Sequence, residues 1–193
     1  MIICIPGLGF DHTMFSHLKY PIITPKTHLA NGMENEVENY VKNAPCHLLG
    51  FSLGGFIAAK IAAKYPVLSL NLIGIRRAYP EHVLHHFKKT IEKSRIAFYR
   101  LCFAKDKSWH SFKKTHLSYY LSHYKLQTWL HNIDWLSKET LRLHMPTTLV
   151  HGTCDQIAPI EEVRLMAEKS KHANLIEIQG EGHLLSKEQI KVR

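Results

Sequence analysis

A serine at position 52 lies in the run Gly50-Phe51-Ser52-Leu53-Gly54-Gly55, which matches the pattern G-x-S-x-G. An apolar segment, 46–49, precedes this run, and a helix-forming segment, 56–64, follows it. So tight a turn between a strand and a helix strains its central residue and requires small neighbours two positions away on either side. The turn presents the hydroxyl at a helix N-terminus, where free N–H groups favour a developing negative charge. We therefore predict that Ser52 is a nucleophile.

A serine hydroxyl is a weak nucleophile until an imidazole takes its proton and a carboxylate orients that imidazole. Asp155 follows the apolar segment 148–151 in the pattern H-G-x-x-D, and His183 follows the apolar segment 174–178 in a glycine-rich loop. Each residue comes at the end of an expected strand, as Ser52 does. The sequence therefore predicts a triad in which His183 is the base and Asp155 is the acid.

Each assignment has an alternative. Asp155 follows a glycine closely and has the character of a turn residue that bonds its own backbone. Glu81, which follows another apolar segment, is a rival acid, and His183 has the alternative of being an exposed loop histidine. We favour Asp155 because its loop is expected to leave the strand on the side of Ser52.

The chain opens with an apolar segment, 2–5, that runs into Pro6-Gly7-Leu8-Gly9-Phe10. A flexible loop after a strand can turn a backbone N–H toward a substrate carbonyl. We expect the N–H groups of Leu8 and Leu53 to form an oxyanion hole. The loop lacks the G-x-G-x-x-G and G-x-x-x-x-G-K-[ST] patterns, which argues against nucleotide binding.

Apolar strand candidates alternate with helix candidates along the chain. The expected strands are 2–5, 22–24, 46–49, 68–73, 148–151 and 175–178, and the expected helices outside the long insertion are 13–18, 34–42, the helix after Ser52, 160–169 and a last helix from residue 184. This alternation predicts an α/β fold with a mostly parallel sheet covered by helices on both faces. We expect a single domain, 1–193, in which 74–146 forms a helical lid.

The motifs P-G-L-G, G-F-S-L-G-G, H-G-T-C-D and G-E-G-H occur in this order, and with them the chain resembles serine carboxylesterases of the α/β-hydrolase superfamily. Within that superfamily it is similar to the esterases that demethylate pimeloyl-acyl-carrier-protein methyl ester in biotin synthesis. Pro6 replaces their usual histidine, and Leu8 replaces their aromatic residue. The resemblance implies that ester as substrate, methanol as leaving group and no cofactor. Because the segment 2–5 starts almost at the first residue, we expect the antiparallel strands that usually open this fold to be absent.

The net charge of +9 is concentrated in the insertion. Residues 74–146 contain 14 basic and 5 acidic residues, whereas the rest of the chain contains 11 of each. A basic lid over an acyl-transfer site suits acyl carrier protein, a small acidic protein that brings the acyl group. The cations that we expect to contact it are Arg76, Arg77, Lys89, Lys93 and Arg100.

Three other interpretations of the basic lid remain. Nucleic acid is disfavoured because no binding motif is present, and an anionic membrane requires surface-seeking lid helices. A plain basic surface is the third. The expected helix 80–101 has an apolar stripe that includes Leu84, Phe87 and Phe98, and it is expected to carry Lys89, Lys93 and Arg100 on its opposite face.

The four cysteines are scattered without a C-x-x-C pattern and are typical of reduced thiols in a cytoplasmic protein. Histidines and cysteines show no metal-binding spacing, so we expect no metal. No apolar run reaches membrane-spanning length, and no leader peptide is apparent. The alternatives to the carrier-dependent esterase are a broad short-chain esterase or thioesterase and a non-catalytic binder of acyl carrier protein or anionic surfaces.

Overall fold

The computed structural model describes residues 1–18, 21–27, 29–123 and 125–190. In this part of the chain, one sheet has the order β2-β1-β3-β4-β5-β6, and every neighbouring pair of strands is parallel. The strands are β1 (Ile2–Ile5), β2 (Ile22–Ile23), β3 (His47–Phe51), β4 (Ser69–Ile73), β5 (Thr147–Gly152) and β6 (Ala173–Ile178). The central strands consist mainly of buried apolar residues because both of their faces are covered. The predicted parallel α/β sheet is confirmed.

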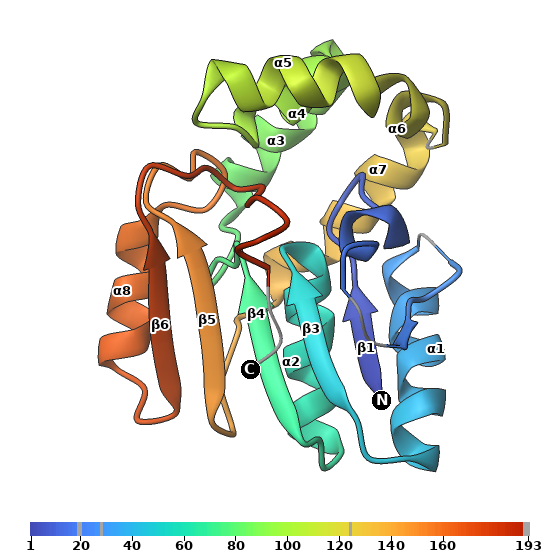
Figure 1. Cartoon of the computed structure of the whole chain (residues 1–193), viewed down its shortest axis with the longest axis vertical. Helices are drawn as coiled ribbons and strands as arrows, with labels where there is room; N and C mark the ends of the chain where they lie inside the picture. Colours follow the sequence, from blue (N-terminus) through green and yellow to red (C-terminus); the bar gives the residue numbers. More distant parts are fainter. Residues whose placement is uncertain (19–20, 28, 124, 191–193) are drawn as a thin grey trace.

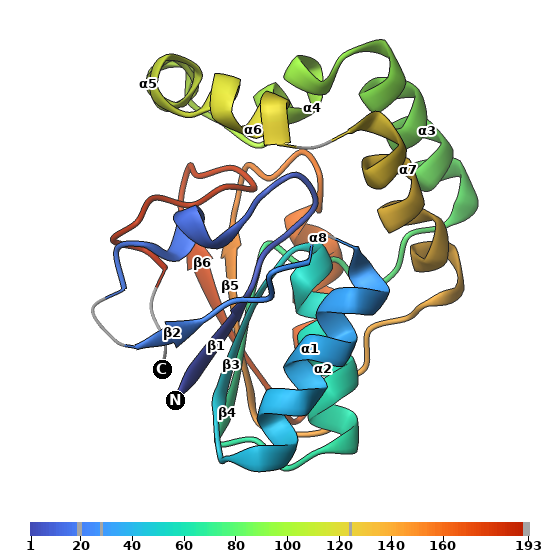
Figure 2. The same ribbon diagram turned by 90° about the vertical axis from the view of Figure 1, so that its right-hand side faces the viewer.

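Helices α1 (Ala30–Asn43), α2 (Leu53–Lys64) and α8 (Ile160–Glu168) pack on one face of the sheet (Figure 2). The 3-10 helix η1 (His12–Phe15) and the segment after β6 lie toward the other face. Helix α2 is apolar almost all round, as a helix against the middle of a sheet must be, and eight of its residues are buried.

A group of helices that we call the cap connects β4 to β5 and lies above the carboxyl ends of the strands (Figure 1). The cap contains α3 (Glu81–Lys93), α4 (Arg95–Leu101), α5 (Asp106–Thr115), α6 (Leu117–His123), α7 (Leu126–Asp134) and η2 (Trp135–Lys138). Its two connections to the sheet meet, because Ala78 pairs with Thr140 and the Leu141 N–H bonds the Arg77 carbonyl at 2.8 Å.

The expected single helix over 80–101 is interrupted at Ser94. This residue has an extended backbone (φ −165°, ψ 114°), and its hydroxyl accepts a hydrogen bond from the Ala97 N–H at 3.2 Å, which caps α4. The expectation that Arg100 shares a helix face with Lys89 and Lys93 is therefore wrong, because the N-cap turn places Arg100 on a different helix.

The helix expected from residue 184 is also wrong as far as residue 190. Leu185 and Ile190 are buried, and between them the chain forms a turn. The Ser186 N–H bonds the side chain of Gln189 at 2.9 Å, and the Gln189 N–H bonds the Ser186 carbonyl at 3.0 Å. These local hydrogen bonds replace the helical ones.

The described residues contain neither a membrane-spanning helix nor a metal-binding cluster. None of their helices is long and apolar enough to cross a membrane. Their histidine, cysteine and acidic side chains form no group of three that would hold a metal ion.

Candidate active site

Ser52 lies between the end of β3 and the start of α2, with φ 52° and ψ −118°. Among the described residues it is the only one other than glycine with a positive φ. Its N–H bonds the Ile73 carbonyl at 2.9 Å. A Cβ on Gly54 would lie 2.2 Å from the Ile5 carbonyl oxygen, so no larger residue fits where the turn passes β1. The sequence pattern thus produces a strained turn that is held from both sides.

Asp155 and His183 are joined by a hydrogen bond of 2.7 Å between Oδ2 and Nδ1. The other carboxylate oxygen of Asp155 accepts from the N–H groups of Ile157 and Ala158, both at 2.8 Å. Both side chains are almost completely buried. Burial alone would raise the pKa of Asp155, but the interactions with His183 and His151 hold it well below its usual value. The carboxylate therefore stays ionised.

His151, on β5, is a second histidine at the same carboxylate. Its side chain is fully buried, and its Nε2 lies 2.7 Å from the Ala158 carbonyl oxygen and 3.3 Å from Asp155 Oδ2. A carbonyl oxygen can only accept, so Nε2 carries the proton and donates toward both oxygens. Its Nδ1 has no hydrogen-bond partner among the described residues.

The His183 loop is packed close to the Ser52 turn. The ring centroids of His183 and Phe51 are 5.0 Å apart. A Cβ on Gly74, directly after β4, would lie 3.2 Å from the His183 ring. From the cap side, the Leu184 N–H bonds the Cys102 carbonyl at 2.9 Å. Residues from β3, β4 and the cap thus fix where His183 lies.

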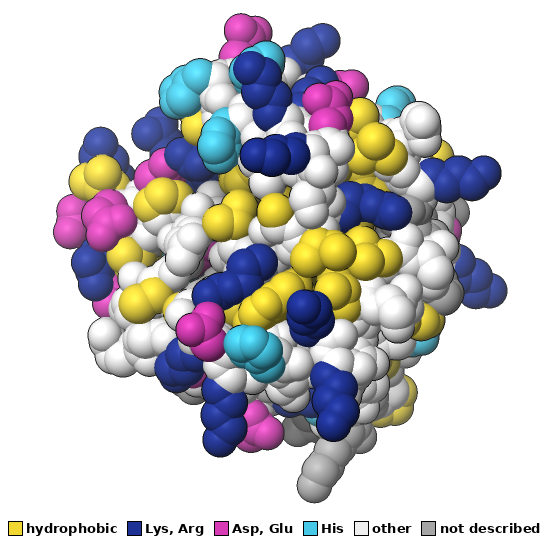
Figure 3. Space-filling model, turned by 90° about the horizontal axis from the view of Figure 1, so that it is seen from above, with side chains coloured by type: hydrophobic (Ala, Val, Ile, Leu, Met, Phe, Trp, Pro, Cys, Tyr) yellow, Lys and Arg dark blue, Asp and Glu magenta, His cyan; other side chains and the backbone are white. Residues whose placement is uncertain are grey.

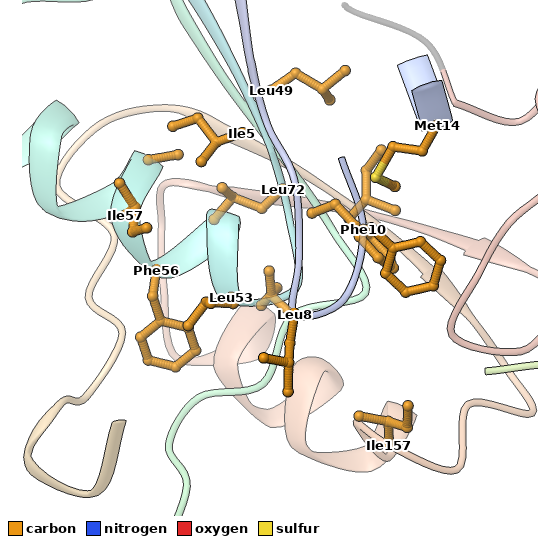
Figure 4. Packing of buried hydrophobic residues seen from close by; sticks show 14 of the residues in the cluster. Ile5, Leu8, Phe10, Met14, Leu49, Leu53, Phe56, Ile57, Leu72 and Ile157 are labelled. Atoms are coloured by element: carbon orange, nitrogen blue, oxygen red, sulfur yellow. The ribbon is translucent and has the colours of Figure 1, made fainter. Parts of the chain in front are cut away.

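The two expected oxyanion donors lie on either side of Ser52. Leu53 is the first residue of α2, where an N–H has no intrahelical partner. Leu8 follows Gly7, and a Cβ on Gly7 would lie only 2.9 Å from Ser52 Cβ, so this loop packs directly against the serine. Figure 4 shows the side chains of Leu8 and Leu53 close together, with Ile157 nearby. The geometry is compatible with an oxyanion hole.

A small cavity adjoins Ser52 beneath the cap, with room for about 20 Å³ of solvent, roughly one water molecule. Its lining comes from the loop that carries Leu8, the start of α2, the loop that carries Asp155, and the cap elements α3, α4, α7 and η2. These residues are Leu8, Ser52, Leu53, Tyr79, Leu84, Phe87, Phe98, Ile133, Leu136 and Ile157. Two cap aromatics, Phe87 and Phe98, therefore lie in the lining of the cavity that adjoins the serine.

The cap holds the loop that carries Leu8. The Tyr99 hydroxyl donates to the Gly9 carbonyl at 2.6 Å. Gly9 has φ 75°, and a Cβ there would lie 2.5 Å from the Trp129 ring. The carboxylate of Asp11 accepts from the Tyr119 hydroxyl at 2.7 Å. Three cap aromatics therefore fix the backbone next to the candidate oxyanion hole.

The expected carrier-binding cations differ in their surroundings. Arg76 is largely buried and forms a two-point ion pair with Glu162. Arg100 pairs with Asp106 at 2.6 Å and bonds the Phe103 carbonyl. The remaining three, Arg77, Lys89 and Lys93, are exposed. Glu81, the rival acid, is exposed at the first residue of α3, whereas Asp155 contacts His183.

Sequence reasoning missed two residues of this site. The sequence pattern assigns His151 only to a strand, although a histidine four positions before the candidate acid is a usable signal. Tyr79 lies six positions after the end of β4, and no sequence pattern singles it out. The structure places Tyr79 in the lining of the cavity, together with Ser52.

No protein-family model and no curated protein sequence match the chain. Solved structures do resemble it. An esterase (EaEST) from Exiguobacterium antarcticum has 18% identity and a TM-score of 0.74 over 94% of this chain and 84% of its own. The hydrolase olei00960 from Oleispira antarctica has 17% identity and a TM-score of 0.74 over 97% of this chain and 85% of its own. A bromoperoxidase from Bacillus anthracis has 16% identity and a TM-score of 0.74 over 94% of this chain and 84% of its own.

The chain has the α/β-hydrolase fold. Its parallel sheet and the position of its cap agree with the solved structures that resemble it. At identities of this size, a structural likeness carries no substrate. The function must therefore be argued from the residues around Ser52.

Proposed function

We propose that this protein is a serine carboxylesterase with Ser52, His183 and Asp155 as its triad. The observation that carries the proposal is the buried 2.7 Å hydrogen bond between Asp155 and His183. The His183 ring packs on Phe51, the residue before a serine with a strained positive φ. An ionised acid bonded to Nδ1 leaves Nε2 of His183 as the atom that accepts the serine proton.

In the proposed reaction, Ser52 Oγ forms a bond to the ester carbonyl carbon and its proton passes to His183. The N–H groups of Leu8 and Leu53 bond the resulting oxyanion. The carbon–oxygen bond to the alcohol then breaks, and the alcohol takes the proton from His183. Water, activated by His183, releases the acid and restores Ser52.

The finer proposal concerns the substrate, for which we propose pimeloyl-acyl-carrier-protein methyl ester. Figure 3 shows many lysine and arginine side chains spread over the cap face, around a band of apolar atoms. Lys89 and Lys93, on α3 of the cap, are exposed and form no ion pair with a described residue. An apolar cavity without a charged residue also suits a neutral methyl ester and disfavours the carboxylate product.

A broad short-chain esterase is the second candidate, and the size of the cavity favours it. A space of about 20 Å³ holds only a small group unless the cap opens. A protein of this kind would hydrolyse free short esters as well as carrier-bound ones.

The test combines labelling with kinetics. A fluorophosphonate probe should label the wild type at Ser52 and leave Ser52→Ala unlabelled, with a loss of ester turnover of about a millionfold in that variant. Asp155→Asn should slow turnover by about four powers of ten, whereas Glu81→Gln should change it little. Activity of Ser52→Ala within tenfold of the wild type would refute the proposal.

Kinetics with two forms of one ester separate the two substrates. Pimeloyl methyl ester on acyl carrier protein should have a much higher kcat/KM than the same ester free in solution. Equal values would favour the broad esterase. A protein that binds the carrier but resists the probe would be the non-catalytic binder.

A further inference from the structure

Tyr79 carries the single polar side-chain group, besides the Ser52 hydroxyl, in the lining of the cavity among the described residues. The residue is buried, and it lines this small cavity together with Ser52. A hydroxyl is costly in an apolar cavity unless it is hydrogen-bonded. The structure therefore keeps this polar group in the space beside Ser52, where a substrate must react.

The ring of Tyr79 is held on several sides. It lies 5.6 Å from the Phe56 ring and 6.0 Å from the Phe87 ring, measured between centroids. The guanidinium of Arg76 lies over it, 5.6 Å from the centroid, and Glu162 holds that guanidinium with two hydrogen bonds. The hydroxyl is thus preorganised and stays beside the serine when a substrate enters.

The hydroxyl remains a donor at neutral pH. Burial raises the pKa of Tyr79 and the nearby charge of Asp155 raises it further, while Arg76 and the Ser52 side chain offset only part of this rise. A neutral phenol can donate to an oxygen acceptor, whereas sulfur is a weak acceptor.

We propose that Tyr79 is a specificity-determining residue that donates a hydrogen bond to the leaving-group oxygen and so favours oxygen esters over thioesters. This inference rests on the proposed function. The leaving oxygen is bonded to the carbon that Ser52 Oγ attacks, so it lies in the small cavity that Ser52 and Tyr79 line together. The leaving oxygen takes its proton from His183 as the carbon–oxygen bond breaks, and Tyr79 keeps its own.

The experiment compares ethyl butyrate with S-ethyl thiobutyrate, which share their acyl and alkyl groups. Tyr79→Phe should lower kcat/KM for the ester about tenfold, the effect of one hydrogen bond in the transition state, and for the thioester less than about twofold. Tyr65→Phe is the matched control, because its hydroxyl bonds Glu38 away from the cavity. It should change neither substrate.

A second variant keeps the hydroxyl. Glu162→Gln weakens the ion pair that holds Arg76 over the Tyr79 ring. It should lower the ratio of ester to thioester turnover, as Tyr79→Phe does, but by a smaller factor. Equal losses on both substrates in Tyr79→Phe, or no loss on the ester, would overturn the inference while labelling of Ser52 still supported the esterase. A wild type that the fluorophosphonate fails to label would overturn both.

Discussion

His151 bonds the same carboxylate oxygen of Asp155 that His183 bonds, at 3.3 Å against 2.7 Å. Because the Ala158 carbonyl fixes the tautomer of His151, this histidine is a permanent donor to the acid. It therefore holds the carboxylate in place from within the sheet. It differs from His183 in having no solvent-exposed surface at all.

Replacing His151 should separate positioning from packing. His151→Phe keeps an apolar ring but leaves the Ala158 carbonyl and one side of Asp155 without a donor, so we expect kcat/KM to fall about tenfold and stability to fall by about 1–3 kcal/mol. Glutamine reaches to a similar distance with an N–H, and His151→Gln should recover much of kcat/KM. Ester kinetics over a pH series, together with urea unfolding, measure both effects. Failure of glutamine to recover activity in a stable variant would argue for packing alone.

The low pKa of Asp155 makes a prediction about acid stability. A carboxyl whose pKa is lower in the folded protein stabilises it above the unfolded value of about 4, and this stability is lost as the pH falls through the folded value. Asp155→Asn removes the titration. Its free energy of unfolding should therefore decrease less than that of the wild type between about pH 6 and pH 3. Parallel curves would contradict the assignment of a depressed pKa.

The turn at Ser52 should tolerate no extra atom at Gly54. Gly54→Ala places a Cβ 2.2 Å from the Ile5 carbonyl oxygen, and we expect a loss of about 3 kcal/mol in stability, with activity reduced as β1 shifts. Gly180→Ala is the control, because Gly180 has a positive φ but its nearest neighbour would be 3.9 Å away. That change should cost about 1 kcal/mol. Urea unfolding of both variants checks the ranking.

The charge of the cap should matter for carrier-bound substrates alone. Lys89→Glu with Lys93→Glu should lower kcat/KM for an acyl-carrier-protein ester about tenfold or more, because exposed charges steer the encounter of the two proteins. Arg100→Glu is avoided, since it would set a glutamate against Asp106. Hydrolysis of p-nitrophenyl butyrate should stay unchanged.

The matched control for this pair is Lys26→Glu with Lys171→Glu, two exposed lysines outside the cap. It makes the same change in net charge and should affect neither substrate. Added salt should reproduce the effect of the cap variant on the carrier ester, because ions screen exposed charges over about 8 Å at physiological ionic strength. Equal effects of the two double variants would leave the cap charge as plain surface.

The sequence predicted the parts of this molecule that depend on local patterns. The strands and the turn at Ser52 follow from apolar runs and glycine spacing, and the pairing of Asp155 with His183 follows from their positions at strand ends. The break at Ser94 was missed because an apolar stripe continued across it, although serine is a good N-cap. Tyr79 was missed because it lies 27 positions after Ser52, with which it shares the cavity, and no spacing rule relates the two.

The contact of Gly9 with Trp129 and Tyr99 limits how this molecule can be rebuilt. The cap supplies the side chains that surround this glycine, so the loop beside the serine and the cap helices depend on each other's residues. A cap taken from another hydrolase would bring different rings to this glycine and would leave its carbonyl unbonded. Recombination between such enzymes should therefore succeed only where the loop over residues 6–10 is exchanged together with its own cap.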